Sequence, residues 1–153
     1  MAQDDFKNVR ISFWNHVKTE FLALGYDVTS TGNIKFEGKD FDTTNVTKWF
    51  EPHILDTNAF NTRKTQRSET WFFQVNCFIK TGPGQEDSVE IMQLVGDVRN
   101  VFENKGISVK DWDAVGDPHV VYLITKRINQ TPIQSDNDNL MMRACTFQGR
   151  IRE

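Results

Sequence analysis

Three histidines and two cysteines are the side chains of this chain that could bind a metal ion or act as nucleophiles. His16, His53 and His119 are far apart in the sequence, and no His-x-x-x-His or Cys-x-x-Cys spacing makes two such groups neighbours. Cys77 falls on the apolar side of an alternating stretch and Cys145 lies in a second strand-like stretch, so we expect buried, unreactive thiols without a disulfide. The sequence therefore predicts neither a metal site nor nucleophilic catalysis.

Two short segments come close to the composition of ligand-binding loops. Residues 32–39 approach the phosphate-binding loop, but their spacer is one residue too long and Asp40 stands where Ser or Thr would bind magnesium. Residues 136–139 carry the oxygen ligands with which a calcium loop begins, but the sixth position is not Gly and the twelfth is Phe147 rather than Glu. Both segments are typical of turns, and we expect no cofactor.

The compact basic cluster of the chain consists of Arg63, Lys64 and Arg67. These residues lie in a polar segment, 56–69, whose only apolar residues are one Ala and one Phe, so we expect at least part of the segment to be exposed. Two interpretations remain open, a solvated loop or a contact with an acidic partner surface or with nucleic acid.

Length and charge set limits on the class of protein. The 153 residues have the size of one domain, 1–153, and twelve Phe and four Trp supply an aromatic core. The formal net charge of −3 argues against a general nucleic-acid binder. The acidic start lacks a secretory signal, and no apolar run approaches the roughly 18 residues of a membrane span. These features predict a cytoplasmic protein.

Two segments carry apolar residues at helical spacing. Over residues 4–24 such residues recur every three or four positions, and Gly25 follows as a natural stop. A second stripe begins at residue 87 or 88 and ends at 105, before Gly106. We expect an amphipathic helix in each segment.

Strand patterns occupy most of the remaining chain. Residues 71–79 alternate strictly between apolar and polar positions, which predicts a strand with one buried face. Pro52 interrupts another strand-like segment and indicates an edge strand or a bulge. We expect further strands or extended ribbons at 34–41, 47–55, 119–125 and 140–151, the last two forming an antiparallel hairpin, with a connector at 107–116.

This order predicts a single-domain α+β fold. We expect a mixed or mainly antiparallel sheet with two helices packed on one face, and long hairpin loops at 56–69 and 129–139.

The middle of the chain resembles a known family. Lys48-Trp49-Phe50-Glu51-Pro52 precedes the polar segment, Trp71-Phe72-Phe73-Gln74-Val75-Asn76-Cys77-Phe78 follows it, and Thr81-Gly82-Pro83-Gly84 leads to a helix that closes on Val101-Phe102. This succession, about a third of the chain, is similar to the tail-terminator (tail-completion) proteins of long-tailed bacteriophages.

The resemblance implies a structural virion protein rather than an enzyme. Such a protein forms a ring, expected to be a hexamer, on the finished tail tube, ends tube polymerisation and provides the joint to the neck or head. Its expected partners are other copies of itself, the tail tube protein and a neck or head-completion protein, and viral DNA passes through the ring without sequence-specific binding. It would be assembled in the bacterial host cytoplasm and reside in the virion.

The resemblance also implies roles for particular residues. Trp49, Phe50, Trp71 and Phe73 would lie in scaffold strands or at the interface between protomers. Arg63, Lys64 and Arg67 would face the tube end or the central channel. Residues 133–139 have no counterpart in the family pattern and receive no role.

Two alternatives stand beside this interpretation. Another neck or head–tail connector protein would also have a small α+β fold and form a ring. Twelvefold instead of sixfold assembly would indicate this class. A small-molecule-binding domain or enzyme would use His53 and Cys77 as its best candidate residues.

Overall fold

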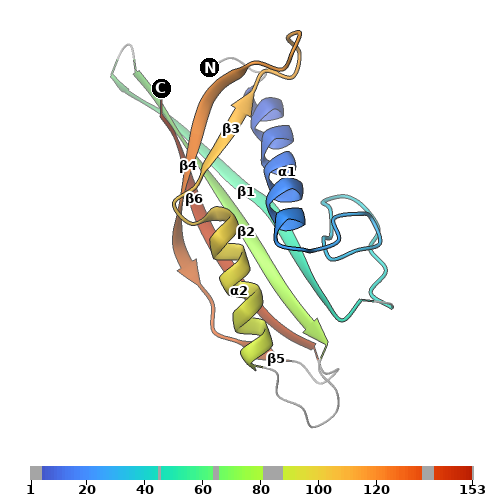
Figure 1. Ribbon diagram of the computed structural model, residues 1–153. Coiled ribbons are helices and arrows are strands. Elements are labelled where there is room, and N and C mark those ends of the chain that lie inside the picture. Colours follow the sequence, from blue (N-terminus) through green and yellow to red (C-terminus); the bar gives the residue numbers. More distant parts are fainter. Residues whose placement is uncertain (1–4, 45, 64–65, 81–87, 136–139, 153) are drawn as a thin grey trace.

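The computed structural model describes residues 5–44, 46–63, 66–80, 88–135 and 140–152 (Figure 1). Within these ranges the chain forms two helices and an antiparallel sheet with strand order β1-β2-β6-β4-β3, in which the short β5 pairs with β6. The helices are α1 (Asp5–Ala23) and α2 (Ser88–Phe102); the strands are β1 (Lys48–Arg63), β2 (Gln66–Lys80), β3 (Gly106–Lys110), β4 (His119–Gln130), β5 (Gln134–Ser135) and β6 (Leu140–Arg152). Both helices cover the same face of the curled sheet, which confirms the predicted α+β class (Figure 1).

The core lies between the helices and this face of the sheet. The alternation in β2 buries every second residue over 71–79, as the sequence predicts. Phe13 of α1 stacks on Phe73 of β2 with ring centroids 4.6 Å apart, and it also lies 5.7 Å from the ring of Phe102 in α2. One cluster of buried side chains thus connects both helices to the sheet. No helix in the described ranges has both the length and the apolarity that a membrane span requires.

The second helix ends earlier than the sequence predicts. It stops at Phe102 rather than Lys105, and Asn104 adopts the left-handed conformation with a φ of 55°. Gly106 is therefore not the helix stop. It begins β3, where a Cβ atom would lie 3.3 Å from Cδ1 of Tyr122 in the neighbouring strand.

The first part of the predicted connector at 107–116 is a strand. β3 pairs with β4 and forms one margin of the sheet. Its alternation buries only Ile107 and Val109, and two apolar residues are too short a pattern to indicate a strand from sequence.

The opposite margin of the sheet is β1, as Pro52 indicated. The segment at 34–41, predicted as a hairpin or ribbon, instead touches the outer edge of β1 at one place. The backbone N–H of Phe50 donates to the carbonyl of Asn33 at 2.8 Å, and that of Lys35 donates to the carbonyl of Phe50 at 2.9 Å. The resulting parallel bridge between Ile34 and Phe50 covers only a short part of the edge.

The polar segment at 56–69 is not the loop that its composition suggested. β1 continues to Arg63 and β2 begins at Gln66, and the two strands pair antiparallel from Lys48↔Ile79 to Arg63↔Gln66. The register shifts twice along this pairing, between Ile54 and Asp56 and between Asn61 and Arg63. Backbone N–H and C=O groups of each strand bond to the other strand, so this part of the hairpin forms strands without an alternation of apolar and polar residues. In the other expected loop, 129–139, β4 reaches Gln130 and β5 occupies two residues, while 136–139 lie outside the described residues.

Candidate assembly surface

The β1–β2 hairpin is longer than the sheet that supports it. β2 pairs with β6 from Thr70 to Lys80, whereas its pairing with β1 continues to Gln66. Residues 66–69 therefore have β1 as their described neighbour on one side and no described strand on the other. We refer to residues 57–63 and 66–70 as the ribbon; its end lies at the same end of the sheet as the C-terminus (Figure 1).

A ribbon of this kind gains little stability by itself. An isolated two-stranded hairpin is at best marginally stable in water, and its outer edges present unpaired N–H and C=O groups. Beyond the bridge at Phe50, β1 offers such an edge along its outer side in the described residues, and Leu55 on this strand has 51% of its surface exposed. The ribbon and the adjoining β1 edge are therefore suited to pairing with another chain.

Two of the three predicted basic residues, Arg63 and Arg67, belong to this ribbon. Arg63 pairs with Gln66 and Arg67 pairs with Asn61, so the backbones of both arginines lie at the end of the ribbon. Lys64 lies outside the described residues, as do the side chains of Arg63 and Arg67. The structure thus gathers the backbones of the two arginines at one end of the sheet.

The four aromatic residues expected in scaffold strands or at an interface are all buried. Phe50, Trp71 and Phe73 face the helices, each at most 2% exposed. Trp49 lies on the other face of the sheet, where its ring stacks on Phe78 with centroids 5.2 Å apart. Side chains so enclosed stabilise the protomer and have little surface to offer a neighbouring copy.

The histidines do not come together. His16 Nε2 lies 2.7 Å from the carbonyl oxygen of Val101, to which it donates, and burial lowers the pKa of this imidazole. His53 lies 3.9 Å from carboxylate oxygens of both Glu37 and Glu51 in the loop and strand at the β1 margin. His119 Nδ1 is 2.7 Å from the hydroxyl of Ser108 at the opposite margin. Among the described residues no group of three metal-binding side chains forms.

The two cysteines are brought into the same part of the core by the β2–β6 register. Val75 pairs with Cys145 and Cys77 pairs with Arg143, so the thiols are diagonal neighbours on the inner face. Both are free and buried, and burial raises the pKa of each thiol. Both thiols are therefore protonated at neutral pH, as expected for core cysteines.

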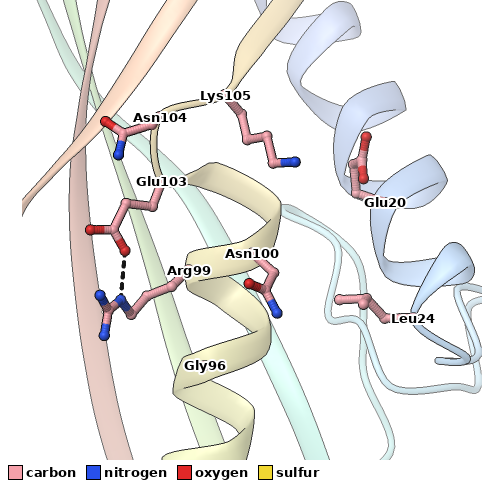
Figure 2. Close-up of a pocket in the computed structure, with 8 residues that line it drawn as sticks. All are labelled: Glu20, Leu24, Gly96, Arg99, Asn100, Glu103, Asn104 and Lys105. Carbon is pink, nitrogen blue, oxygen red and sulfur yellow. Dashed lines mark hydrogen bonds and ion pairs between the residues drawn. The ribbon is translucent and has the colours of Figure 1, made fainter.

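A groove of about 640 Å³ runs between α1 and α2 (Figure 2). In Figure 2 Arg99 and Glu103 point away from α1 and pair with each other, with 2.6 Å between Arg99 Nε and Glu103 Oε2. The hydrogen bond to Arg99 is the largest cause that lowers the pKa of Glu103. The groove lining consists of Glu20, Leu24, Gly96, Arg99, Asn100, Glu103, Asn104 and Lys105. These open, largely polar walls bring no thiol or hydroxyl beside a general base, so they do not form the arrangement that nucleophilic catalysis needs.

Two structural features escaped prediction from sequence. The hydroxyl of Tyr26 donates a hydrogen bond to the Asp97 carboxylate of α2, a pairing whose only signal was an aromatic residue directly after the helix stop. The β3–β4 loop, 111–117, carries Val115 at its tip with its side chain fully exposed. The sequence predicted a connector at 107–116 and gave no indication of an exposed apolar residue in it.

Comparison with known proteins gives matches in structure but none in sequence family. No protein-family model matches the chain, and no curated protein matches it. Eleven chains of solved structures match. In one of them the alignment covers 100% of this chain and 97% of the other, with a TM-score of 0.62 and 13% sequence identity. At this level of identity the likeness shows that the α+β arrangement is shared, and it carries no functional assignment.

Proposed function

We propose that this chain is a structural virion protein that assembles into a ring, binds the end of a phage tail tube, stops tube polymerisation and forms the joint to the neck or head. The observation that carries the proposal is the ribbon together with the uncovered β1 edge. Both present backbone hydrogen-bonding groups at one margin of the sheet, where a second chain can extend it.

The position of the two sheet margins favours a ring over a dimer. β1 and β3 lie at opposite margins and differ in length and sequence. A contact that uses different surfaces on the two partners is heterologous, and repeated heterologous contacts close into a ring when the rotation between copies permits it. The sequence resemblance to tail terminators supplies the expected number of six copies.

The basic cluster of Arg63, Lys64 and Arg67 gives the ring a surface that can bind a partner. Arg63 and Arg67 have their backbones at the ribbon end, and Lys64 follows Arg63 in the sequence. In a hexamer, three cations per copy amount to about eighteen positive charges on one rim, enough to bind an acidic tube end by multivalency. A cationic rim also tolerates DNA passing through the channel, because phosphate contacts need no base recognition.

Native mass spectrometry of the purified chain over a range of concentrations, with and without tail tube protein, tests the proposal. A sixfold species, formed alone or on the tube end, is the expected result. A twelvefold species would instead indicate a neck or connector protein. A chain that stays monomeric with the tube protein present and leaves tube length unchanged would overturn the proposal.

A shortened hairpin provides the matched variant. Replacing residues 59–69 by Asn-Gly closes β1 and β2 with a two-residue turn next to the Asn58↔Thr70 pair. This change removes most of the ribbon and leaves the buried part of β2, which begins at Thr70, in place. We expect a folded monomer that no longer assembles; a shortened variant that still forms the ring would show that the ribbon is not the contact.

A further inference from the structure

A second surface suited to assembly lies on the side of α1 that faces the segment after this helix. Trp14 and Phe36 form an aromatic pair there, with ring centroids 5.4 Å apart, and both are partly buried. The Nζ atom of Lys18 lies 5.3 Å from the centroid of the Phe36 ring. A pocket of about 390 Å³ opens at this pair, and Lys39 contributes to its rim.

The pocket is basic. Arg10, also on its wall, is neutralised by Glu37 through a contact of 2.8 Å. Among the ion pairs formed by the described residues, none involves Lys18 or Lys39. An occupant that matches this site therefore carries an apolar side chain for the aromatic pair and carboxylates beside it.

The β3–β4 loop of the same chain has this chemistry. Val115 at its tip is completely exposed. Asp111, Asp113 and Asp117 surround the tip in the sequence, and the Asp113 carboxylate is already paired with Lys7 of the same chain at 2.6 Å. A fully exposed valine with Asp111 and Asp117 near it is a small apolar knob beside carboxylates.

The loop is held in one shape before any partner arrives. The backbone N–H of Asp117 donates to the carbonyl of Ala114 at 3.2 Å, and that of Asp111 donates to the carbonyl of Pro118 at 2.9 Å. Gly116 and Asp117 both have positive φ, 82° and 46°, which turns the chain sharply behind Val115. A preorganised loop loses little conformational entropy when it docks.

The loop is also anchored to α1. The backbone N–H of Trp112 donates to the side chain of Asn8 at 3.2 Å, and its indole N–H donates to the hydroxyl of Ser12 at 3.1 Å. Asp113 adds an ion pair with Lys7 at 2.6 Å. The loop therefore contacts the first half of α1 through Lys7, Asn8 and Ser12, whereas the helix residues that line the pocket are Arg10, Trp14 and Lys18.

We propose that the loop 111–117 of one copy docks into the Trp14–Phe36 pocket of the next, so that Val115 contacts the aromatic pair while Asp117 faces Lys18 and Lys39. This proposal rests on the proposed self-assembly and names a contact between neighbouring copies in the ring. The contact is heterologous, because the two surfaces differ.

A charge exchange tests the contact. Val115→Arg removes the apolar knob and brings a cation against Lys18 and Lys39, so we expect association to weaken by about tenfold or more. Val89→Arg is the matched control, because Val89 on α2 is also exposed, at 69%, and lies outside the proposed contact. In the background of Lys18→Glu with Lys39→Glu, Val115→Arg should restore association, because the introduced arginine then faces two carboxylates.

Disulfide trapping gives an independent measurement. Val115→Cys and Phe36→Cys, each in its own chain, should form a mixed disulfide dimer when the two variants are combined under mild oxidation. The native thiols do not interfere, because Cys77 and Cys145 are buried.

The two proposals fail in different ways. The docking proposal is wrong if the wild type assembles, the Val115→Arg and Val89→Arg variants assemble to the same extent, and no cross-link forms between positions 115 and 36. The ring proposal is not affected by that result. If the wild type forms no assembly, either alone or on the tube protein, both the ring proposal and the proposed docking contact are wrong.

Discussion

The hydroxyl of Tyr26, in the segment that follows α1, donates a hydrogen bond to the carboxylate of Asp97 in α2. Tyr26 is 9% exposed, and its ring packs edge-on against Phe50 of β1 with centroids 4.9 Å apart. Burial, followed by the hydrogen bond to Asp97, raises the pKa of Tyr26, so the hydroxyl remains a donor at any physiological pH. This pair ties the end of α1, the edge strand and α2 into one unit.

Removing this hydroxyl should destabilise the protomer. Tyr26→Phe leaves the Asp97 carboxylate beside a buried ring without its donor, and we expect a loss of about 1–3 kcal/mol in the free energy of unfolding. Urea denaturation measures the change. Tyr122→Phe is the matched control, because Tyr122 is 52% exposed, and its effect should stay within about 0.5 kcal/mol. Equal effects at the two positions would show that the Asp97 pair contributes nothing.

Trp71 separates a scaffold role from an interface role. Its side chain is 2% exposed and faces the helices, so Trp71→Ala should cost about 3–5 kcal/mol and lower the melting temperature measured by circular dichroism. A variant that keeps the wild-type melting temperature but no longer assembles would instead place this tryptophan between protomers.

Two glycines should respond to alanine with opposite signs. A Cβ atom at Gly149 of β6 would lie 2.9 Å from Cγ of Leu123 and 3.0 Å from Cε2 of Phe73, so Gly149→Ala should destabilise by about 1–3 kcal/mol. At Gly96 in α2 a Cβ atom meets nothing within 4 Å, and Gly96→Ala should stabilise by about 0.5–1 kcal/mol. Thermal unfolding of both variants checks this pair, and a destabilising Gly96→Ala would contradict the open space.

His16 should make the protomer less stable in mild acid. Burial is the largest cause that lowers the pKa of His16 below its ordinary value of 6.5, so the unfolded chain binds a proton more readily than the folded one. The stabilisation is therefore complete above pH 6.5 and is lost as the pH falls from there through the folded pKa. His16→Gln keeps an N–H donor for the Val101 carbonyl and cannot titrate.

Urea titrations between pH 7.5 and about 5 measure this dependence. We expect the free energy of unfolding of the wild type to fall more steeply towards pH 5 than that of His16→Gln. His53 and His119 are present in both proteins, so their contributions cancel in the comparison. Parallel curves would show that His16 is not responsible.

Reversing the ribbon charges should block joining without unfolding the protomer. Arg63, Lys64 and Arg67, all changed to Glu, would oppose an acidic tube end, and we expect loss of binding to the tail tube. The buried part of β2 is unchanged, so circular dichroism should remain native. Tail joining that persists after the triple reversal would remove these residues from the contact.

The sequence by itself determined those elements whose signal is local. Helical spacing predicts α1 and α2, and strict alternation predicts the buried part of β2, because side-chain direction repeats every 3.6 residues in a helix and every two in a strand. Apolar patterning also selected much of the core, including the inward face of residues 71–79. The basic cluster could be found from sequence, since it depends on residue type alone.

Only the tertiary structure decided the features that join distant residues. The β2–β6 register makes Cys77 and Cys145 diagonal neighbours, and the pairing of β1 with β2 turns the polar segment 56–69 into strands. β3 is a strand because β4 pairs with it, although its own pattern is too short to indicate one. The pocket at Trp14 likewise depends on the packing of the segment after α1 against this helix. Such relationships arise from long-range backbone pairing and packing, which no local period in a sequence encodes.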